Sequence, residues 1–447
     1  MKKNVAIIGA GLTGLTTAYY LKKAGIPFHI FEKSENTGGV IRSEKKAGFI
    51  FEKGPNTGVV ANLELARLLE DLAKTIRVVY ADETAQKRLI WKKQQWHALP
   101  SGLFSAVFTP LFTTKDKLKV AGEYFRKRGN SPTESLAETV ERRLGKSFLD
   151  YAIDPFVSGV YAGDPQKLIT KYAFPKLYNL EEKYGGFIKG SIKINKERSE
   201  EFKKKVNKKI FSFETGLQEL TDELTKRIGK ENFSLNQKDL EVKYVSSHNF
   251  LIDNRNYTHV ISTINANAIK KSFSFIDSEI IQKITSLVYA PVVEISIGFD
   301  KWQGLKLDAF GGLIPTKEKK NILGVLFISS QFPNRAPKGG AFFSVFMGGT
   351  RKREFINLTD EELIKILEKD FKKLMQLENF SPDLLEISRH PQAIAQYSND
   401  TPLRLEAIGK AEKTYPGLLI KGSVKDGIGI ADRVAQAFNT AQLIQKV

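Results

Sequence analysis

Residues 5–14, Val-Ala-Ile-Ile-Gly-Ala-Gly-Leu-Thr-Gly, decide the fold that we expect for this 447-residue chain. The apolar run Val5–Ile8 is typical of a buried parallel strand, and a helical pattern follows the glycines to about Lys23. Phe28–Phe31 predicts a second strand, and Glu32 stands at its end. Strand, glycine turn, helix, strand and acid come in the order of a dinucleotide-binding βαβ unit.

Each part of this unit has a physical task. Gly9 permits a tight turn, Gly11 lets the backbone approach a pyrophosphate, and Gly14 lets helix and strand pack closely. The helix N-terminus offers free amides to the phosphates, and Glu32 is placed to accept hydrogen bonds from a ribose. The alternative is a glycine turn in an ordinary βαβ unit. The residues expected to bind the cofactor here are Gly9, Ala10, Gly11, Leu12, Thr13, Gly14, Glu32 and Lys33.

The next two segments favour FAD over NAD. Gly38–Ser43 resembles the second glycine motif of the amine-oxidase-like flavoprotein superfamily, in which Arg42 would assist the pyrophosphate. Phe51–Thr57 resembles the segment of that superfamily beside the flavin ring. Two ordinary glycine-containing loops are the alternative. The resemblance adds these expected FAD-binding residues: Gly39, Val40, Arg42, Gly54, Pro55, Asn56 and Thr57.

Composition excludes several classes of chemistry. The chain has no cysteine, which excludes disulfides, thiolate catalysis and Cys-based metal sites, and we assign no metal. Redox chemistry would therefore come from a bound cofactor. The N-terminus leads directly into the first strand, so we expect no signal peptide and a cytoplasmic protein, with the inner face of the cell membrane as an alternative location. Apolar runs stay shorter than the roughly 20 residues of a membrane-spanning helix.

The formal net charge is +19. We expect no nucleic-acid partner, because the excess is spread along the chain and no motif of a nucleic-acid-binding module appears. Attraction to anionic lipid or to a polyanionic substrate would also explain the charge. The basic stretch 193–209 is interpreted as a solvated helix or loop, and we assign it no role.

Leu99–Phe112 is apolar, interrupted by proline and glycine, and followed by a basic segment at 115–128. This pattern suits peripheral membrane attachment. It also suits the rim of an apolar substrate pocket, or plain core. Residues 58–76 and most of 131–205 have helical patterns, and Ser135-x-x-Glu138 and Thr359-x-x-Glu362 predict capping boxes.

Longer segments carry a more specific resemblance. Phe156–Pro165 reads Phe-Val-Ser-Gly-Val-Tyr-Ala-Gly-Asp-Pro, and Phe332–Pro337 reads Phe-Pro-Asn-Arg-Ala-Pro. With Gly311–Pro315 and Gly427–Ile430, they make the chain similar to the oxygen-dependent protoporphyrinogen/coproporphyrinogen oxidase family along almost its whole length. One departure is Gly422-Ser423, where the family often has Gly-Asn; serine can still donate a hydrogen bond.

The resemblance implies oxidation of a porphyrinogen to a porphyrin, in three two-electron steps, with hydride transfer to FAD and oxygen as acceptor. It implies no side-chain acid or base. Arg88 matches an arginine for a propionate, Gly159 a glycine facing the substrate, and Leu313 a leucine on a pyrrole ring; Phe346 and Met347 lie where another pocket wall is expected. From pattern alone, Arg88 would be a surface residue and the three apolar residues core. The further expected FAD-binding residues are Leu240, Ser423, Ile428, Gly429 and Ile430.

The expected fold class is α/β (α+β overall), with three lobes. A discontinuous Rossmann-type FAD-binding lobe takes residues 1–91, 207–270 and 397–447. A helical lobe for substrate or membrane takes residues 92–206. A substrate lobe of antiparallel strands takes residues 271–396, with strands expected at Val292–Phe299, Gly324–Ser330 and Phe342–Met347.

Other functions remain open at this level. One alternative is another flavin oxidase of the superfamily, acting on amines or polyenes. A second is a non-enzymatic flavin- or porphyrin-binding protein, and a third is an anionic-surface binder. Protoporphyrinogen, with two propionates, is favoured over coproporphyrinogen, with four. Binding four carboxylates would require more basic groups at the pocket. The chain is expected to be a monomer or a homodimer.

Overall fold

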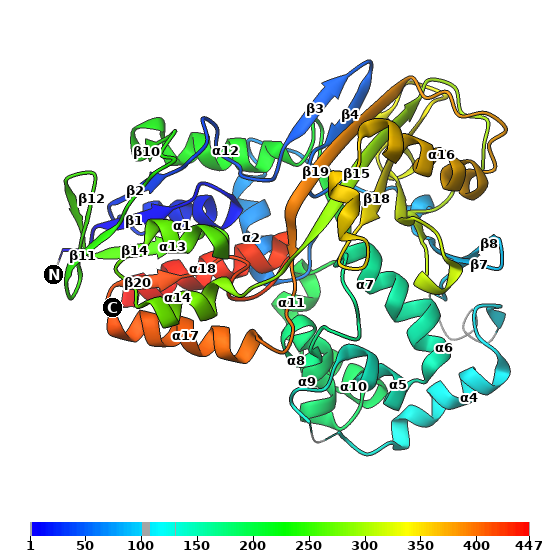
Figure 1. The fold of residues 1–447 in the computed structure, drawn as a ribbon, viewed down its shortest axis with the longest axis horizontal. Helices are drawn as coiled ribbons and strands as arrows, with labels where there is room; N and C mark the ends of the chain where they lie inside the picture. Colours follow the sequence, from blue (N-terminus) through cyan, green and yellow to red (C-terminus); the bar gives the residue numbers. More distant parts are fainter. Residues whose placement is uncertain (1, 101–107, 130, 447) are drawn as a thin grey trace.

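The computed structural model describes residues 2–100, 108–129 and 131–446. Residues 101–107 of the predicted apolar segment therefore lie outside the described residues. Figure 1 shows the dinucleotide-binding lobe with both chain ends, the strand-rich lobe beside it and the helical lobe below the strand-rich one. The predicted fold class is confirmed.

A five-stranded sheet forms the centre of the dinucleotide-binding lobe. Its strand order is β10-β2-β1-β14-β20, and all its pairs are parallel. Parallel strands that are buried on both faces have continuous apolar sequences. The apolar run Val5–Ile8 therefore predicts the first strand of this sheet. The strands are β1 (Val5–Ile8), β2 (Phe28–Phe31), β10 (Phe233–Ser234), β14 (His259–Ser262) and β20 (Leu418–Ile420).

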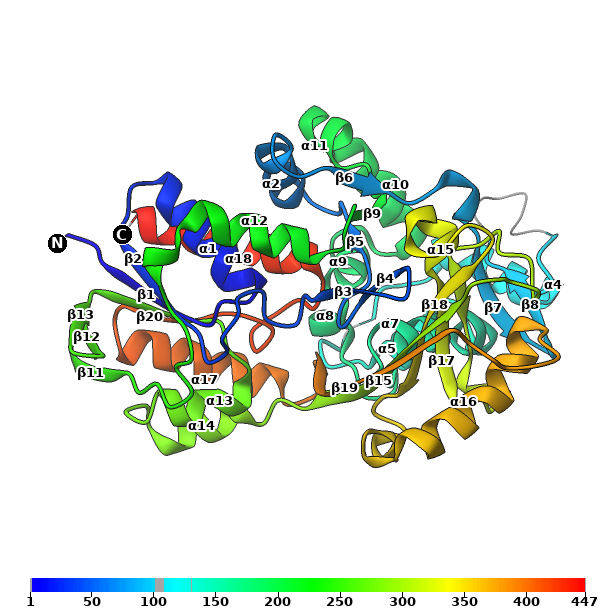
Figure 2. The same ribbon diagram turned by 90° about the horizontal axis from the view of Figure 1, so that it is seen from above.

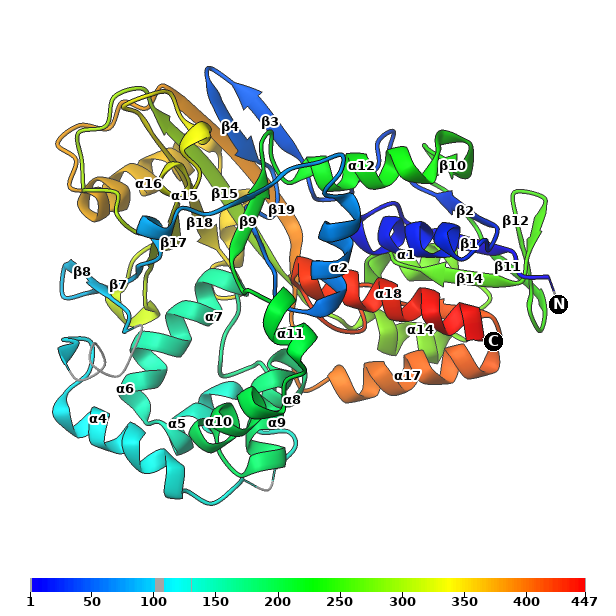
Figure 3. The same cartoon turned by 180° about the vertical axis from the view of Figure 1, so that it is seen from behind.

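Helices and a small sheet cover the two faces of this central sheet. One face packs against α1 (Leu12–Lys23), α2 (Leu63–Leu72), α12 (Gln218–Ile228) and α18 (Ile430–Lys446). The other packs against α13 (Ala266–Ser272), α14 (Ser278–Thr285), α17 (Thr401–Thr414) and the sheet β11 (Lys243–Ser246), β12 (Asn249–Ile252) and β13 (Arg255–Tyr257). The helices α1 and α18 lie side by side (Figure 3) although they come from opposite ends of the chain.

A seven-stranded sheet forms the second lobe, in the order β19-β15-β18-β17-β16-β7-β8. Neighbouring strands are antiparallel except β16 and β7. Helix α16 (Asp360–Met375) covers one face. The strands are β7 (Arg88–Lys92), β8 (Gln95–Ala98), β15 (Tyr289–Phe299), β16 (Gly311–Leu313), β17 (Ile322–Phe327), β18 (Ala341–Gly348) and β19 (Leu384–Ala395).

The opposite face of this sheet looks toward the other lobes. The hairpin of β3 (Ser43–Lys46) and β4 (Phe49–Glu52) packs Phe49 and Phe51 against Phe342 of β18. The short helix α15 (Ile328–Gln331) follows β17. A three-stranded antiparallel sheet lies beside the hairpin, made of β5 (Gly58–Val59), β9 (Ile210–Phe213) and β6 (Val78–Tyr80). Seen from above, β15 and β19 run from the strand-rich lobe toward the dinucleotide-binding lobe (Figure 2).

Short helices make up the third lobe. A capping box at Ser135 starts α5 (Leu136–Arg143), as predicted, and the predicted capping box at Thr359 starts α16 of the second lobe. Within the basic stretch, Lys203 and Lys205 of α11 form ion pairs with glutamates. The helices of the lobe are α4 (Thr114–Ala121), α5 (Leu136–Arg143), α6 (Lys146–Phe148), α7 (Asp154–Val160), α8 (Thr170–Ala173), α9 (Pro175–Tyr184), α10 (Phe187–Glu197) and α11 (Glu200–Lys205).

Two predicted boundaries need correction. Strands β7 and β8 belong to the seven-stranded sheet, because β7 pairs with β16, so the boundary placed at residue 91 divides a hairpin. The strand predicted to reach Ser330 ends at Phe327, where the chain turns into α15. Among the described residues, no helix has the length and apolar character to cross a membrane.

Candidate active site

The first glycine turn is built as a cradle in front of α1. Gly9 has a φ of +105°, and a Cβ atom on Gly14 would lie 2.0 Å from the Gly9 carbonyl oxygen. A Cβ atom on Gly11, by contrast, would have nothing within 4 Å. Gly11 is the N-cap of α1, and glycine has no side chain to occupy the first amides of the helix. The amides of the first turn, Leu12 and Thr13 among them, are therefore placed for a phosphate group.

Glu32 is buried directly beside this turn. Its Oε2 accepts a hydrogen bond from the Ala10 amide at 2.7 Å, and its Oε1 accepts one from the Ser34 amide at 2.9 Å. A carboxylate oxygen can accept two hydrogen bonds, and each oxygen of Glu32 accepts one from the backbone. The carboxylate can therefore also accept hydrogen bonds from ribose hydroxyls. Lys33 is exposed. The Gln237 amide donates to the Glu32 carbonyl oxygen at 2.8 Å, which brings the loop preceding β11 close to Glu32.

Leu240 lies in that loop and packs in part against the core of the lobe. Strand β11 begins only at Lys243, so Leu240 lies in a connection next to the carboxyl end of β2. In open parallel sheets, ligands bind outside the carboxyl ends of the strands, so this position is compatible with contact to a nucleotide.

The second glycine segment lies on the first. The Gly38 amide donates to the Ala10 carbonyl oxygen at 2.8 Å, and a Cβ atom on Gly39 would lie 3.1 Å from Gly11 Cα. Val40 is exposed, and a Cβ atom on Gly54 would lie 2.0 Å from its carbonyl oxygen. The segments 38–42 and 53–57 therefore run together from the cradle toward the seven-stranded sheet. Arg42 is exposed beside the Gly39 carbonyl oxygen.

Pro55 and Thr57 are half-buried in that second segment, while the side chain of Asn56 is turned into the sheet. Asn56 Nδ2 donates to Glu294 Oε1 at 2.6 Å, and the Ser344 hydroxyl donates to Asn56 Oδ1 at 2.6 Å. The predicted flavin-ring segment is thus fixed to β15 and β18. The side-chain amide of Asn56 makes this attachment. Any contact of Asn56 with the cofactor is therefore expected from its backbone.

The C-terminal glycine segment reaches the same region. The hydroxyl of the buried Tyr397 donates to the carbonyl oxygens of Ser423 and Gly427, at 2.8 and 3.0 Å. Ile428 and Gly429 follow, and α18 begins at Ile430. Because α18 packs on α1, the start of α18 and the first glycine turn belong to one surface of the lobe.

The specific segment of residues 156–165 lies against this surface. Burial raises the pKa of Tyr161 to about 12, and the charge of Asp432 in the first turn of α18 adds to that effect. The side-chain amide of Gln396 donates to the Tyr161 carbonyl oxygen at 2.9 Å. Tyr161 is therefore buried in the neighbourhood of the start of α18, and Gln396 holds its backbone.

The predicted substrate residues Gly159 and Leu313 are in contact. A Cβ atom on Gly159 would lie 2.4 Å from Leu313 Cδ2 and 3.7 Å from the Leu323 carbonyl oxygen. Leu323 and Phe346 pack with Ala162 and Val292 in one apolar cluster. The structure thus brings α7, β16, β17 and β18 together around Gly159 and Leu313.

The structure places the predicted substrate residues Arg88 and Met347 in different surroundings. Arg88 is exposed, and it shares a face of β7 with Ile90, which packs with Leu313. This places Arg88 at the margin of the apolar wall. Met347 is fully buried in the core under α16, on the other face of β18 from Phe346. We therefore withdraw Met347 from the predicted pocket wall, because adjacent residues of a strand point to opposite faces.

Two titratable residues near the site were not predicted. Glu294 is 2% exposed, and burial raises its pKa. His390 Nε2 lies 3.8 Å from Glu294 Oε2. The one signal in the sequence was the charge of Glu294 inside the apolar run Tyr289–Phe299.

These residues fit FAD: an open cradle at the start of α1, a buried carboxylate beside it, a second glycine segment on top, and the start of α18 close by. Gly9–Gly14 and Arg42 would hold the pyrophosphate, and Glu32 a ribose. The segment 54–57 leads from there to the apolar wall around Leu313, where the redox-active ring of FAD would meet a substrate.

Comparison with known proteins supports FAD as the cofactor of this chain. A family model described as flavin-containing amine oxidoreductase matches residues 12–435. Protoporphyrinogen oxidase 2 of Arabidopsis thaliana is 30% identical, over 99% of this chain and 94% of the relative. Coproporphyrinogen III oxidase of Bacillus subtilis is 25% identical, over 97% of this chain and 96% of the relative.

Solved structures share the fold. A protein from Exiguobacterium sp. 255-15 superposes with a TM-score of 0.80 at 22% identity, covering 100% of this chain and 99% of its own. Cyclohexylamine oxidase from Brevibacterium oxydans has a TM-score of 0.71 at 14% identity, covering 100% and 99%. Similarity at this level of identity concerns the architecture.

Proposed function

The chain belongs to the flavin-containing amine oxidoreductase family, and from that premise we propose that it oxidises a porphyrinogen to the corresponding porphyrin. FAD is its cofactor and oxidoreduction its activity. The observation that carries the choice of substrate is the near-full-length similarity to protoporphyrinogen and coproporphyrinogen oxidases. The apolar wall around Gly159, Leu313 and Phe346 supports it, because a porphyrinogen presents a large apolar surface.

When bound, FAD supplies the hydride acceptor. The residues of this chain position the macrocycle for that transfer. Leu313 and Phe346 pack on pyrrole rings, and the missing side chain of Gly159 leaves room for Leu313 in this wall. Arg88, at the margin of the wall, pairs with a propionate carboxylate. Three such transfers would remove the six electrons of the overall oxidation, with oxygen as the proposed final acceptor.

Protoporphyrinogen is the proposed substrate, and coproporphyrinogen is the alternative. Arg88 is the single cation that we place at the pocket, which suits the substrate with two propionates better than the one with four. The relatives include enzymes named for each substrate, so the two have to be compared directly.

The test is the release of fluorescent porphyrin from each colourless porphyrinogen by FAD-loaded protein, with oxygen consumption followed in parallel. FAD without protein gives the spontaneous rate. We expect turnover well above that rate and a higher kcat/KM for protoporphyrinogen. Porphyrin formation at the spontaneous rate with both substrates would refute the proposal. Turnover of amines or polyenes instead would assign the chain to another oxidase class, and porphyrin binding without anaerobic flavin reduction would make it a binding protein.

We also propose that the helical lobe attaches to an anionic membrane surface. Leu118 and Phe125 are 69% and 86% exposed, and Lys115, Lys119 and Arg126 lie in the same segment. Exposed apolar side chains among cations favour binding to acidic lipid. Flotation with vesicles of phosphatidylglycerol should retain the wild type, and Leu118→Ser with Phe125→Ser should lower the bound fraction. Equal binding of wild type and variant would exclude this surface.

A further inference from the structure

A buried carboxyl group lies behind the proposed substrate wall. Glu294 belongs to β15, whose even-numbered residues near it point away from the core under α16. Asn56 Nδ2 donates to its Oε1 at 2.6 Å, and His390 Nε2 is 3.8 Å from its Oε2. Burial of a carboxyl group is costly without such partners. Attachment of the 54–57 segment to the sheet accounts for the hydrogen bonds of Asn56 and Ser344. A glutamine at position 294 could accept the same hydrogen bond from Asn56, so the attachment does not explain why this residue is a glutamate.

The position of Glu294 connects it to the substrate wall. Its cross-strand partner on β18 is Phe346, and Val292 precedes it by two residues on the same face. Directly opposed residues of antiparallel strands have their Cβ atoms about 4.5–5.5 Å apart. The carboxyl group of Glu294 is therefore next to the side chain that we assign to the wall of the porphyrinogen pocket.

His390 connects the same carboxyl group to the cofactor lobe. It lies on β19 opposite Val292. Its Nε2, which faces Glu294, is buried, while the side chain as a whole is 24% exposed, so the rest of the ring borders solvent where Glu294 does not. Two residues further on, Gln392 Oε1 accepts a hydrogen bond from Asn265 at 3.3 Å. Asn265 is the N-cap of α13 and follows the carboxyl end of β14, the edge at which ligands of parallel sheets bind.

We propose that Glu294 takes up the proton that a porphyrinogen releases in each oxidation step, and that His390 passes this proton to solvent. The inference rests on the proposed function. In each step a bridging carbon loses a hydride, with two electrons, to the flavin. A pyrrole N–H bond breaks, its electrons complete the new double-bond system of the macrocycle, and the proton goes to the Glu294 carboxylate. Three steps thus yield three hydrides, from three bridging carbons, and three protons. The fourth bridging carbon becomes CH when one of its protons moves to a pyrrole nitrogen by tautomerisation, which restores the two N–H groups of the porphyrin.

Other charged groups face Glu294 from the elements packed against it. Burial raises the pKa of Glu52, on β4, to about 7, and Glu294 and Glu52 repel each other when both are ionised. Arg335 is buried near Glu52 and opposes that effect. Desolvation raises the pKa of Glu294, and the neighbouring His390 and the hydrogen bond from Asn56 limit the rise. Glu294 accepts a proton only when ionised, so the step should slow as the pH falls through this raised pKa.

The experiment uses the FAD-loaded full chain and Glu294→Gln, whose amide can still accept from Asn56. Anaerobic flavin reduction by protoporphyrinogen and by coproporphyrinogen is followed in a stopped-flow instrument over a range of pH. We expect Glu294→Gln to slow reduction about 100-fold, the lower end of general acid–base effects, and to remove the acidic break of the pH profile. His390→Gln should keep the break and show a smaller loss of rate.

Glu52→Gln is the matched control, because it removes a buried carboxyl group from the β3–β4 hairpin that packs on this sheet and leaves Glu294 in place. It should keep the acidic break, shifted toward lower pH by the loss of a repelling neighbour. FAD content and melting temperature show that each variant is folded. A wild-type pH profile in Glu294→Gln would overturn the proposal.

A second measurement separates this inference from the proposed function. The midpoint potential of bound FAD is determined against pH in wild type and in Glu294→Gln, without any porphyrinogen. A carboxyl group that titrates beside the flavin should change the slope of this dependence in the wild type alone. Wild-type flavin that no porphyrinogen reduces would refute the proposed function. Identical pH dependence of the potential in the two proteins would refute the role of Glu294.

Discussion

Leu313 contacts Gly159 so closely that a Cβ atom on the glycine would lie 2.4 Å from Leu313 Cδ2. Gly159→Ala must therefore displace Leu313 from the proposed substrate wall. Overpacking of this kind costs about 1–3 kcal/mol. We expect kcat/KM for porphyrinogen oxidation to fall about tenfold, with FAD content unchanged, as measured by porphyrin fluorescence at varied substrate concentration.

Gly409→Ala is the control for this substitution. A Cβ atom on Gly409, in the exposed face of α17, would have nothing within 4 Å. This variant should keep the wild-type kcat/KM. Wild-type kinetics in Gly159→Ala as well would show that the substrate does not occupy the wall at Leu313.

Arg88 should matter for substrates that carry carboxylates. A hydrogen bond to a charged group contributes about 1.5–3 kcal/mol, so Arg88→Ala should lower kcat/KM by about 10- to 150-fold. The loss should fall mainly on KM, because the propionate is far from the bridging carbon that reacts. Steady-state kinetics with a porphyrinogen and with its propionate methyl ester measure the effect. The ester should be insensitive to the substitution.

The neighbouring Lys87 provides a control of equal charge. Its Nζ is 2.8 Å from Asp308 Oδ2 at the surface, with both side chains well exposed. Lys87→Ala should leave KM unchanged for the porphyrinogen. An equal effect of the two substitutions would indicate that general attraction by the basic protein, and not a specific contact of Arg88, raises affinity.

Alanine substitutions at two glycines of the first motif should have different effects, one on stability and the other on FAD binding. A Cβ atom on Gly14 would lie 2.0 Å from the Gly9 carbonyl oxygen, whereas one on Gly11 would meet nothing within 4 Å of the protein. Gly14→Ala should therefore lower the melting temperature. Gly11→Ala should fold with the wild-type melting temperature when both proteins are stripped of FAD, and should bind FAD at least about tenfold more weakly, because its methyl group occupies the approach of the pyrophosphate. Thermal unfolding of stripped protein and FAD titration distinguish the two.

Local motifs could be predicted from the sequence because their residues are neighbours in the chain. Gly9, Gly11 and Gly14 are spaced by the turn that they form, and the acid at the end of β2 follows from the same unit. The capping boxes at Ser135 and Thr359 have the same character, since each involves residues three apart. Side-chain periodicity of two also separates Phe346 from Met347, once β18 is known to have one face on the core.

Partners that are distant in the chain could not be predicted. Glu294 contacts Asn56, and Asn56 contacts Ser344, over separations of 238 and 288 residues. The pattern of one strand does not reveal which strand lies beside it, so the sequence alone does not predict that β7 pairs in parallel with β16. A charge in the middle of an apolar strand indicates a special environment, but its partners come from the tertiary structure.

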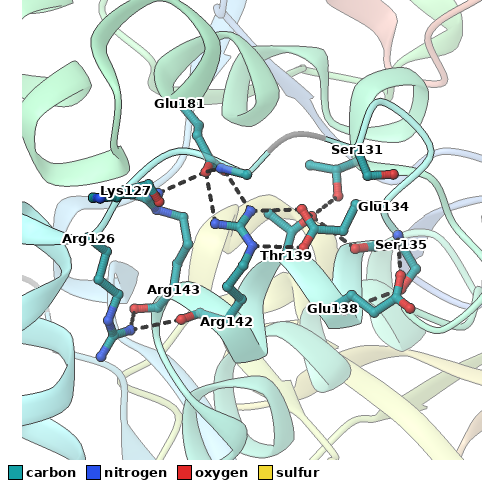
Figure 4. Close-up of polar contacts among 12 residues, drawn as sticks. Arg126, Lys127, Ser131, Glu134, Ser135, Glu138, Thr139, Arg142, Arg143 and Glu181 are labelled. Atoms are coloured by element: carbon teal, nitrogen blue, oxygen red, sulfur yellow. Dashed lines mark hydrogen bonds and ion pairs between the residues drawn. The ribbon is translucent and has the colours of Figure 1, made fainter.

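A buried ion-pair network holds the helical lobe together (Figure 4). Arg143 is fully buried; its guanidinium lies 2.5 Å from Glu123 and 2.8 Å from Glu181, while Arg142 contacts Glu181 and Glu134 at 2.9 and 2.7 Å. Removing one member of a buried pair leaves the other charge uncompensated and costs about 3–5 kcal/mol. Arg143→Met should lower the stability of this lobe by that amount. The exposed pair of Arg67 and Glu201 is the control, since Arg67→Met should cost less than about 1 kcal/mol.

The same network predicts how stability depends on pH. Burial would raise the pKa of Glu181, but the hydrogen bond from Arg142 and the charges of both arginines outweigh it and hold the pKa below its usual value. A carboxyl group with a lowered folded-state pKa stabilises the protein above its unfolded-state pKa, and this stability is lost as the pH falls through the folded-state value. Urea unfolding at pH 7 and at successively lower pH should show this loss in the wild type and a smaller one in Arg142→Gln. An equal slope in both proteins would mean that Arg142 does not hold Glu181 ionised.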